Sequence, residues 1–317
     1  MPQLQKLVGL PINASAEGGG IDGLTGWVHL LMAVLFVGWS LLFLFMLVRF
    51  RRGKHPRADH EGVKSHASSY IEAIIAVLEI VLLVTFSIPL WSKKVSAFPA
   101  ETERPVHVRI IAQQFAWNIH YPGPDGKFGR TDVKLVTDDN AIGLDRKGDG
   151  KDDVVELNQL RLPVNRPAIV EITTKDVIHS FFLPLLRVKQ DAIPGMMIPI
   201  HFTPTQTTEE IRQQMIETVS IPPRNRNLEL YTPTEDLKDK DGNVLVKKGG
   251  LLTTSVVKKI TAAGITTLSV APYNPTEIAC AQLCGLNHFK MKGYLTVQSE
   301  ADFDKWYADE VESQKEE

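Results

Sequence analysis

Two long apolar runs, Trp27 to Val48 and Ile71 to Trp91, constrain the fold of this chain more than any other feature. The first run contains no formally charged residue. At about 1.5 Å of rise per residue, each run can cross a hydrocarbon core roughly 30 Å thick. Trp27 and Trp91 lie at the ends of the runs, where amphipathic rings favour the membrane interface. We therefore predict a transmembrane helical hairpin over residues 25–94.

The loop between the runs is strongly basic. In the segment before them, residues 1–24, Lys6 is the only basic residue. The basic residues of the loop are Arg49, Arg51, Arg52, Lys54, Arg57 and Lys64. The positive-inside rule places such a loop in the cytoplasm, with segment 1–24 and the long C-terminal part exported. We expect a multi-pass protein of the bacterial inner membrane with a large periplasmic domain.

Two carboxylates interrupt the second apolar run. Glu72 lies one residue into the run, so it is either an interfacial carboxylate or a participant in proton uptake. Glu79 lies deeper, where an ionised carboxylate costs ~2.5–3.5 kcal/mol, and should therefore face a protein partner. Their spacing of seven places both on one helix face. We expect this face to be buried against another membrane subunit.

After Phe98, short runs rich in β-branched and aromatic residues alternate with clusters of Gly, Pro, Asn and Asp. This pattern predicts an antiparallel sandwich or barrel. The predicted strand-forming runs are residues 106–121, 168–174, 179–186, 197–203 and 293–298. The net charge of -2 argues against nucleic acid as a partner, because binding phosphates requires a basic surplus.

An acidic, Gly-rich stretch interrupts the predicted strands. Its residues Asp145, Asp149, Asp153 and Glu156 match four ligand positions of a calcium loop, and Gly150 matches the turn position. Lys147, however, stands where an oxygen ligand belongs, and no flanking helices are predicted. We favour an acidic turn over a calcium site.

The stretch IACAQLCGLNHFKM contains four metal-ligand side chains, Cys280, Cys284, His288 and Met291. Thiolate, imidazole and thioether together favour copper, whereas zinc sites rarely use Met. A disulfide between Cys280 and Cys284 is the alternative in an oxidising compartment, but it leaves His288 and Met291 without a role.

CAQLCGLNHFKM resembles the C-x-E-x-C-x-x-x-H-x-x-M motif of cytochrome c oxidase subunit II. Upstream, DVIHSFFLPLLRVKQDAIPGM is similar to the family's D-V-L-H-S…P…K-x-D-A-I-P-G segment, and QFAW before a YP turn resembles its aromatic motif. The resemblance implies an all-β, cupredoxin-like Greek-key sandwich or barrel over residues 95–204 and 272–299, following the two-helix transmembrane hairpin.

The resemblance also implies a dinuclear copper A centre. Cys280 and Cys284 bridge the two coppers, and His179 and His288 bind one copper each. Met291 is then a weak axial ligand, and Gln282 offers its backbone carbonyl.

The implied function is that of the electron-accepting subunit of a proton-translocating haem–copper oxidase. Such a subunit takes electrons from cytochrome c, or from a cytochrome c domain, and passes them to haem in subunit I, which also holds copper B. Subunit III is a further expected partner, and oxygen is reduced in another chain. The alternatives are the copper A subunit of a nitric oxide reductase, an anchored copper carrier and a disulfide-bearing binding module. Quinol oxidases lack the copper ligands present here.

Several positions depart from the family pattern or match it with a specific consequence. Gln282 replaces the glutamate that helps hold magnesium at the subunit I interface, so the resemblance gives a magnesium site here little support. Phe115 replaces the first Trp of Q-W-x-W, through which electrons are thought to arrive, and we interpret the remaining Trp117 as a packing residue. Glu72 matches an acid near a proton channel of subunit I, whereas Glu79 stands where Pro is common.

Asp176 matches an acid beside the copper-binding His. It is either a solvated turn residue or a docking residue for a basic partner.

The largest departure is an insert over residues 205–271 that reads as a hairpin, a helix ending at Gly264 and a strand. It faintly resembles a small sandwich-barrel module of bacterial RNA polymerase large subunits. This small α+β insert is either a docking surface for a further respiratory complex or a self-contained decoration, since surface-loop insertions cost little. Residues 300–317 should form a charged surface helix.

Overall fold

The computed structural model describes residues 9–54, 57, 60–61, 64–221 and 227–315. Lys6 and the end of the predicted C-terminal helix lie outside the described residues. The chain divides into two compact units. One contains Gly18–Phe98, and the other contains Ile12–Glu17 together with the chain from Pro99 onward.

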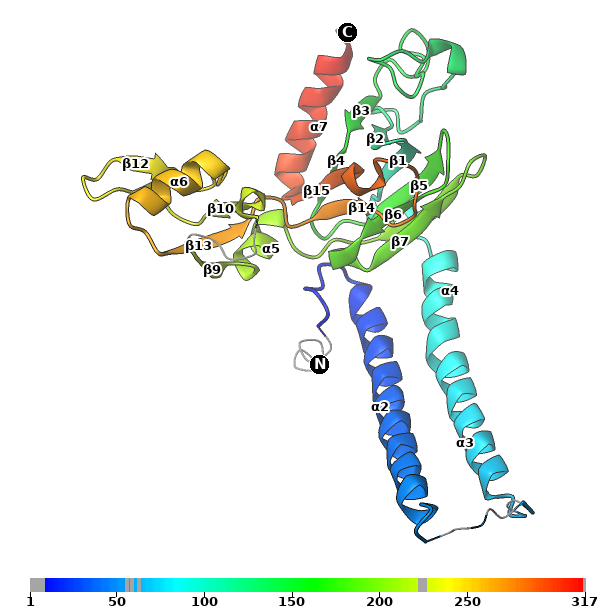
Figure 1. Ribbon diagram of the computed structural model, residues 1–317. Coiled ribbons are helices and arrows are strands. Elements are labelled where there is room, and N and C mark those ends of the chain that lie inside the picture. The colour runs from blue at the N-terminus through cyan, green and yellow to red at the C-terminus, as the bar shows by residue number, and fades with distance from the viewer. Residues whose placement is uncertain (1–8, 55–56, 58–59, 62–63, 222–226, 316–317) are drawn as a thin grey trace. The chain divides into compact units, whose positions relative to one another are not determined.

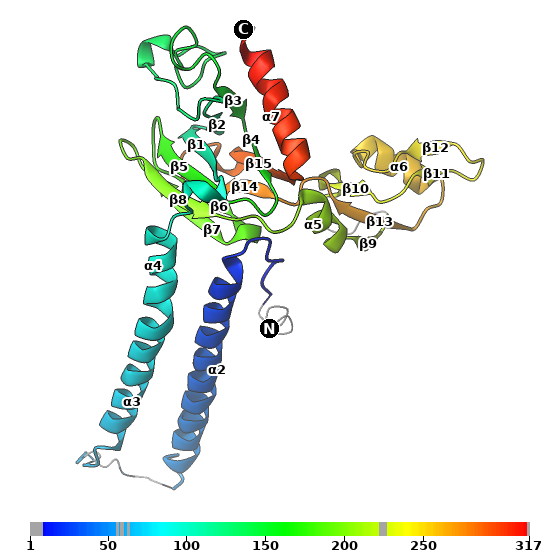
Figure 2. The same cartoon turned by 180° about the vertical axis from the view of Figure 1, so that it is seen from behind.

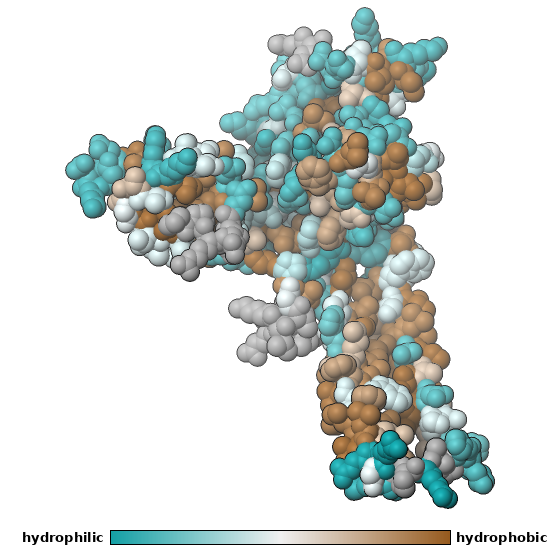
Figure 3. Space-filling view, viewed as in Figure 1, coloured by the Kyte–Doolittle hydropathy of each residue, from teal (hydrophilic) through white to brown (hydrophobic). Residues whose placement is uncertain are grey.

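The first unit is helical. Helix α2 spans Gly18–Arg49, and a continuous helical run, Ala67–Ser96, consists of α3 (Ala67–Leu82), the π-helical turn η1 (Leu83–Ser87) and α4 (Ile88–Ser96). Both runs are long and apolar enough to cross a membrane. Figure 3 shows hydrophobic side chains along both helices and hydrophilic side chains at the loop that joins them. The predicted pair of apolar helices is confirmed, although the π turn was not expected.

The second unit is built on two five-stranded sheets (Figures 1 and 2). The first has the order β3-β2-β1-β5-β8 and contains β1 (Val106–Gln113), β2 (Ala116–Tyr121), β3 (Val154–Leu157), β5 (Ala168–Thr174) and β8 (Ile198–Phe202). The second has the order β4-β15-β14-β6-β7 and contains β4 (Gln159–Pro163), β6 (His179–Leu183), β7 (Val188–Ala192), β14 (Glu277–Cys280) and β15 (Lys292–Gln298).

A single hydrophobic core joins the two sheets. Trp117 and Val170 of the first sheet and Phe181 and Leu295 of the second are fully buried in the same cluster. Side chains alternate along the strands, so that β5 reads buried and half-buried in turn. This arrangement confirms the predicted cupredoxin-like β-sandwich.

Strand pairing corrects two details of the prediction. The sheets are not wholly antiparallel, because β1 pairs with β5 and β15 pairs with β4 in parallel. The predicted strand over residues 106–121 is a hairpin, β1 paired antiparallel with β2, which turns at Gln114–Phe115. That turn has no Gly, Pro, Asn or Asp to mark it. Strands β3, β4, β7 and β14 were not predicted, because they are short and several carry charged residues.

The segment between β2 and β3 is organised by a buried hydrogen-bonded pair, Asp153 and His120. Asp153 is fully buried, accepts hydrogen bonds from the backbone N–H of Gly123 and Gly129, and lies 2.5 Å from His120 Nε2. Glu156 lies in β3, and Asp145 caps the backbone N–H groups of Lys147 and Gly148.

Among the described residues, the four acids of the proposed calcium loop do not form a group that could share an ion. The calcium alternative therefore finds no support, and the favoured acidic turn agrees with the hydrogen bonds that Asp145 and Asp153 accept. The short turn η3 (Val133–Leu135) lies in the same segment.

The inserted region has a core of its own. It contains α5 (Thr208–Gln214), β9 (Glu217–Ser220), η5 (Leu228–Leu230), β10 (Tyr231–Pro233), β11 (Leu237–Lys238), β12 (Val244–Val246), α6 (Thr254–Ala262) and β13 (Thr267–Pro272). The predicted hairpin, helix and strand are present as β11–β12, α6 and β13. The buried residues of its core run from Val219 to Val270, whereas Ile211 of α5 belongs to the main core.

Helix α7 (Glu300–Lys315) runs beside β4 (Figures 1 and 2). The helix is present as predicted, but it is not only a surface helix. Phe303 and Val311 are buried in the main core, and Arg161 lies over the Trp306 ring. The remaining short turns of this unit are η2 (Glu101–Glu103), η4 (Pro184–Leu186) and η6 (His288–Lys290).

Candidate metal centre

Three segments of the second sheet bring the predicted ligands to one place. His179 begins β6, and Cys280 ends the neighbouring strand β14. The two strands pair antiparallel, with Cys280 opposite Phe181, so the two ligands are brought together by the register of the sheet. Cys284 follows in the loop after β14, and η6 begins at His288 and ends one residue before Met291.

The ligand atoms form a compact cluster. His179 Nδ1 lies 3.1 Å from Met291 Sδ and 3.9 Å from Cys280 Sγ. Cys284 Sγ lies 3.8 Å from Cys280 Sγ, 3.5 Å from His288 Nδ1 and 3.8 Å from Met291 Sδ. Both cysteines are free, since bonded sulfurs would be only about 2.05 Å apart. The disulfide alternative therefore does not describe this structure.

This donor set fits copper. Two nitrogen or sulfur ligands each about 2.0–2.3 Å from one ion lie roughly 3–4 Å apart, and the observed separations fall in that range. Thiolate, thioether and imidazole donors together favour copper over hard cations. Gln282 offers its backbone carbonyl, 3.2 Å from Cys280 Sγ, and its side chain is exposed. Among the described residues no group of acids gathers around Gln282, so the structure gives a magnesium site no support.

The two thiols differ in acidity. Burial raises the pKa of Cys280, but hydrogen bonds, led by the one from His179, outweigh it and bring that pKa down to about 6. Burial, reinforced by the charge of Cys280, raises the pKa of Cys284 to about 11. Without metal, the pair therefore holds one thiolate and one thiol at neutral pH. Because metal ligation requires both thiolates, binding must release the second proton.

Asp176 orients His179. Its Oδ1 lies 2.8 Å from His179 Nε2 and its Oδ2 accepts a hydrogen bond from Gln114 N–H at 2.7 Å. Burial raises the pKa of Asp176, but these hydrogen bonds, with one from Val177 N–H, hold the pKa below its ordinary value. With Nε2 donating its proton to this carboxylate, Nδ1 is the nitrogen that faces the sulfur atoms and, once it loses its own proton, can bind metal.

Trp117 and Phe115 occupy different surroundings. Trp117 is fully buried and packs edge-on against His179 and Phe181, with ring centroids 6.2 and 5.7 Å away. It has no surface on which an outside electron donor could lie, which favours its interpretation as a packing residue. Phe115 is half-buried and lies against Gly285. Gly285 belongs to the ligand loop, the segment from Ala281 to Met291 that follows β14.

Gln114 is the first residue of the QFAW motif, but the sequence did not reveal that it contacts the ligand segments. Its side-chain Nε2 donates to the carbonyl oxygen of Cys284 at 2.5 Å, across 170 positions of sequence. The QFAW motif marks the position, but nothing in the local sequence shows that the Gln114 side chain reaches Cys284. Glu72, in contrast, lies in α3 of the helical unit and is exposed there.

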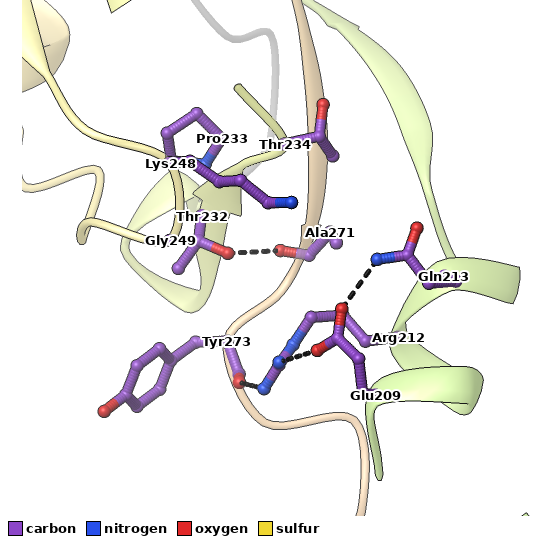
Figure 4. Close-up of a pocket in the computed structure, with 10 residues that line it drawn as sticks. All are labelled: Glu209, Arg212, Gln213, Thr232, Pro233, Thr234, Lys248, Gly249, Ala271 and Tyr273. Atoms are coloured by element: carbon purple, nitrogen blue, oxygen red, sulfur yellow. Dashed lines mark hydrogen bonds and ion pairs between the residues drawn. The ribbon is translucent and has the colours of Figure 1, made fainter. Parts of the chain in front are cut away.

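The cavity in Figure 4 is separate from the ligand cluster. It encloses about 240 Å³ between α5, β10, β13 and the loop before α6. Several polar groups of its lining bond to one another. Arg212 bonds Glu209 and the carbonyl of Tyr273, and Gln213 bonds Glu209. We interpret it as the joint between α5 and the inserted module.

Residues 106–213 match the sequence family described as "Cytochrome C oxidase subunit II, periplasmic domain". The ligand loop lies beyond this range, after the insert. The chain is 22% identical over 293 residues to the "Alternative cytochrome c oxidase subunit 2" of Bradyrhizobium diazoefficiens, covering 91% of this chain and 79% of that protein.

It is 26% identical over 207 residues to the "Cytochrome c oxidase subunit 2" of Cereibacter sphaeroides, covering 61% of this chain and 66% of that protein. The solved periplasmic domain of subunit II of cytochrome oxidase of Bradyrhizobium japonicum aligns with 20% identity and a TM-score of 0.32, covering 67% of this chain and 94% of that one. Residues 106–213 therefore match the periplasmic domain of the cytochrome c oxidase subunit II family, and most of the chain is similar to proteins named as subunit 2 of that oxidase.

Proposed function

We propose that this chain is the electron-accepting subunit of a haem–copper terminal oxidase. It takes electrons from cytochrome c at a dinuclear copper site and passes them to haem in subunit I, where oxygen is reduced. The observation that carries this proposal is the convergence of five soft-donor side chains. They come from two strands and one loop: His179, Cys280, Cys284, His288 and Met291.

The residues of the site would have different roles as metal ligands. Cys280 and Cys284 would hold both ions, His179 and His288 one each, with Met291 and the Gln282 carbonyl as weaker ligands. When bound, such a copper pair takes up and releases single electrons with little change in its bonds. The sheet supports this by holding His179 and Cys280 on adjacent strands, so the ligands are positioned before metal arrives.

Exposed apolar side chains near the ligands support docking of protein partners. Leu283, Leu286 and Phe289 of the ligand loop are 79%, 95% and 68% exposed. Val177 and Ile178 precede His179 and are also exposed. Apolar patches of this kind mark interaction sites on soluble domains. We assign this surface to the haem-bearing subunit, with cytochrome c, subunit III and, through the insert, a further respiratory complex as other partners.

The helical unit anchors the chain. The basic residues between α2 and α3 favour a cytoplasmic loop and an exported β-domain, which in a bacterium lies in the periplasm. Glu72, near the cytoplasmic end of α3, is the candidate for proton uptake. Glu79 lies near the middle of the apolar run, where we expect it to contact a polar group of a partner helix.

Copper reconstitution tests the proposal. The detergent-solubilised chain, loaded with copper under reducing conditions, should bind two coppers and show an electron-spin signal shared by two nuclei. Binding of one copper, or of none with the thiols reduced, would contradict the assignment. With the partner subunits present, oxygen consumption driven by reduced cytochrome c is expected. Consumption of nitric oxide in its place would favour the reductase.

A further inference from the structure

The hairpin turn between β1 and β2 contacts both parts of the ligand set. Gln114 donates from its backbone N–H to Asp176, whose other oxygen bonds His179, and from its side chain to the Cys284 carbonyl. The two ligand segments are far apart in sequence. Gln114, from a third segment, therefore contacts both the carboxylate that holds His179 and the backbone of the loop that carries Cys284.

The Cys284 carbonyl belongs to the peptide at which the ligand loop changes direction. The next residue, Gly285, has φ of +135°, a conformation that L side chains rarely adopt. Its carbonyl accepts the His288 N–H at 3.1 Å, and the His288 carbonyl accepts the Met291 N–H at 3.1 Å. The orientation of the Cys284–Gly285 peptide thus sets where His288 and Met291 lie.

Close packing at Gly285 supports the same contact independently. A Cβ atom at Gly285 would lie 2.7 Å from Gln114 Nε2 and 3.1 Å from the Phe115 ring. The turn and the loop approach each other so closely that only glycine leaves room. Phe115 is itself packed against the main core, so the turn has a fixed support.

We propose that Gln114 is a positioning residue for the metal centre, which clamps the loop from Cys284 to Met291 against the segment that holds His179. It touches no ligand atom directly and acts through the Cys284 carbonyl. This inference depends on the proposed copper function. In that setting, the clamp limits movement of the ligands between oxidation states.

The test compares Gln114→Ala with Gln113→Ala in the copper-loaded, detergent-solubilised chain. Gln113 is the matched control, because it is adjacent and its side chain instead accepts from Lys175. We expect Gln114→Ala to release copper to a chelator about tenfold faster, as outer-shell changes commonly do. We also expect a changed copper hyperfine pattern and reduction potential. Gln113→Ala should match the parent chain in all three measurements.

Two further variants separate positioning from general destabilisation. Gln114→Asn keeps an amide and should recover part of the copper retention. Gly285→Ala should weaken retention as well, but less than additively in combination with Gln114→Ala, because both changes break one contact. Equal spectra and release rates for Gln114→Ala and Gln113→Ala would overturn the clamp. Failure of the parent chain to bind two coppers would instead overturn the proposed function.

Discussion

At the scale of single residues, the ligand set depends on side chains that are not ligands. Asp176 illustrates this, because its carboxylate accepts hydrogen bonds from His179, Gln114 and Val177. The sequence left two interpretations of Asp176 open, a solvated turn residue and a docking residue for a basic partner. The geometry favours a third role, that of fixing which nitrogen of His179 is available to metal.

Replacing Asp176 with Asn should therefore weaken copper binding by about 10–100-fold, the usual effect of removing an outer-shell carboxylate. A competition titration with a copper chelator measures this. Asp191→Asn, on the exposed face of β7, is the control and should not change affinity. If Asp176 acts only in docking, copper affinity stays constant and only the rate of reduction by cytochrome c falls.

A second residue-scale prediction concerns His120. Burial lowers the pKa of His120 more strongly than its hydrogen bond with Asp153 raises it. The folded state therefore holds the proton less tightly than the unfolded chain, whose His titrates at about 6.5. Stability is fully present above that pH and falls as pH drops below it.

The urea midpoint of the β-domain, followed by Trp fluorescence in the detergent-solubilised chain, should therefore decrease from about pH 7.5 to about pH 5.5. His120→Gln should lower the midpoint at both pH values, because it breaks the pair with Asp153, but should flatten the dependence. An equally steep dependence in the variant would assign the effect to another group.

At the scale of elements, the insert and the β-sandwich have separate cores. Within the described residues, α5 joins them. Ile211 packs in the sandwich, and Arg212 bonds the carbonyl of Pro272. Figure 4 shows the bond from Arg212 to the carbonyl of Tyr273 at the end of the insert. We therefore propose that the inserted module begins after Met215 and ends near Tyr273. Glu217 near its start pairs with Val270 near its end, so the ends lie close enough for a short linker to join them.

Replacing residues 216–272 with a short Gly-Ser linker should leave two coppers bound and the electron-spin signal unchanged. The physical reason is that no ligand or residue of the clamp belongs to the insert. Copper analysis and spectroscopy of the shortened chain check this. Loss of copper from a folded shortened chain would show that the module supports the centre. Loss of binding to one partner alone would identify its docking role.

At the scale of the whole molecule, the chain combines a helical unit that carries acids with a β-domain that carries soft metal ligands. In the assembled oxidase, Glu72→Ala should slow proton uptake and turnover while reduction of copper by cytochrome c stays normal. Stopped-flow reduction and a pH-sensitive dye measure the two processes. Glu61→Ala, in the loop beside the helix, is the control. Normal turnover in Glu72→Ala would leave Glu72 as an interfacial carboxylate.

Local patterns determined the two apolar helices, the β-sandwich and the ligand residues. Both kinds of signal are local in the sequence. An apolar run long enough to cross a membrane is continuous, and the soft donors Cys280, Cys284, His288 and Met291 lie within one short stretch. His179 was assigned through resemblance, and the sheet register then placed it beside Cys280. The calcium alternative, which the sequence already disfavoured, found no support for the opposite reason. A string of acids does not show that Asp153 will be buried against His120.

Only the tertiary structure decided how these parts meet. The parallel pairing of β1 with β5 and the contact from Gln114 to Cys284 both join segments far apart in the chain. Sequence periodicity reports which face of an element is apolar, and donor spacing reports local ligands. Neither reports which distant carbonyl or carboxylate completes a buried polar group, because that depends on packing of the entire domain.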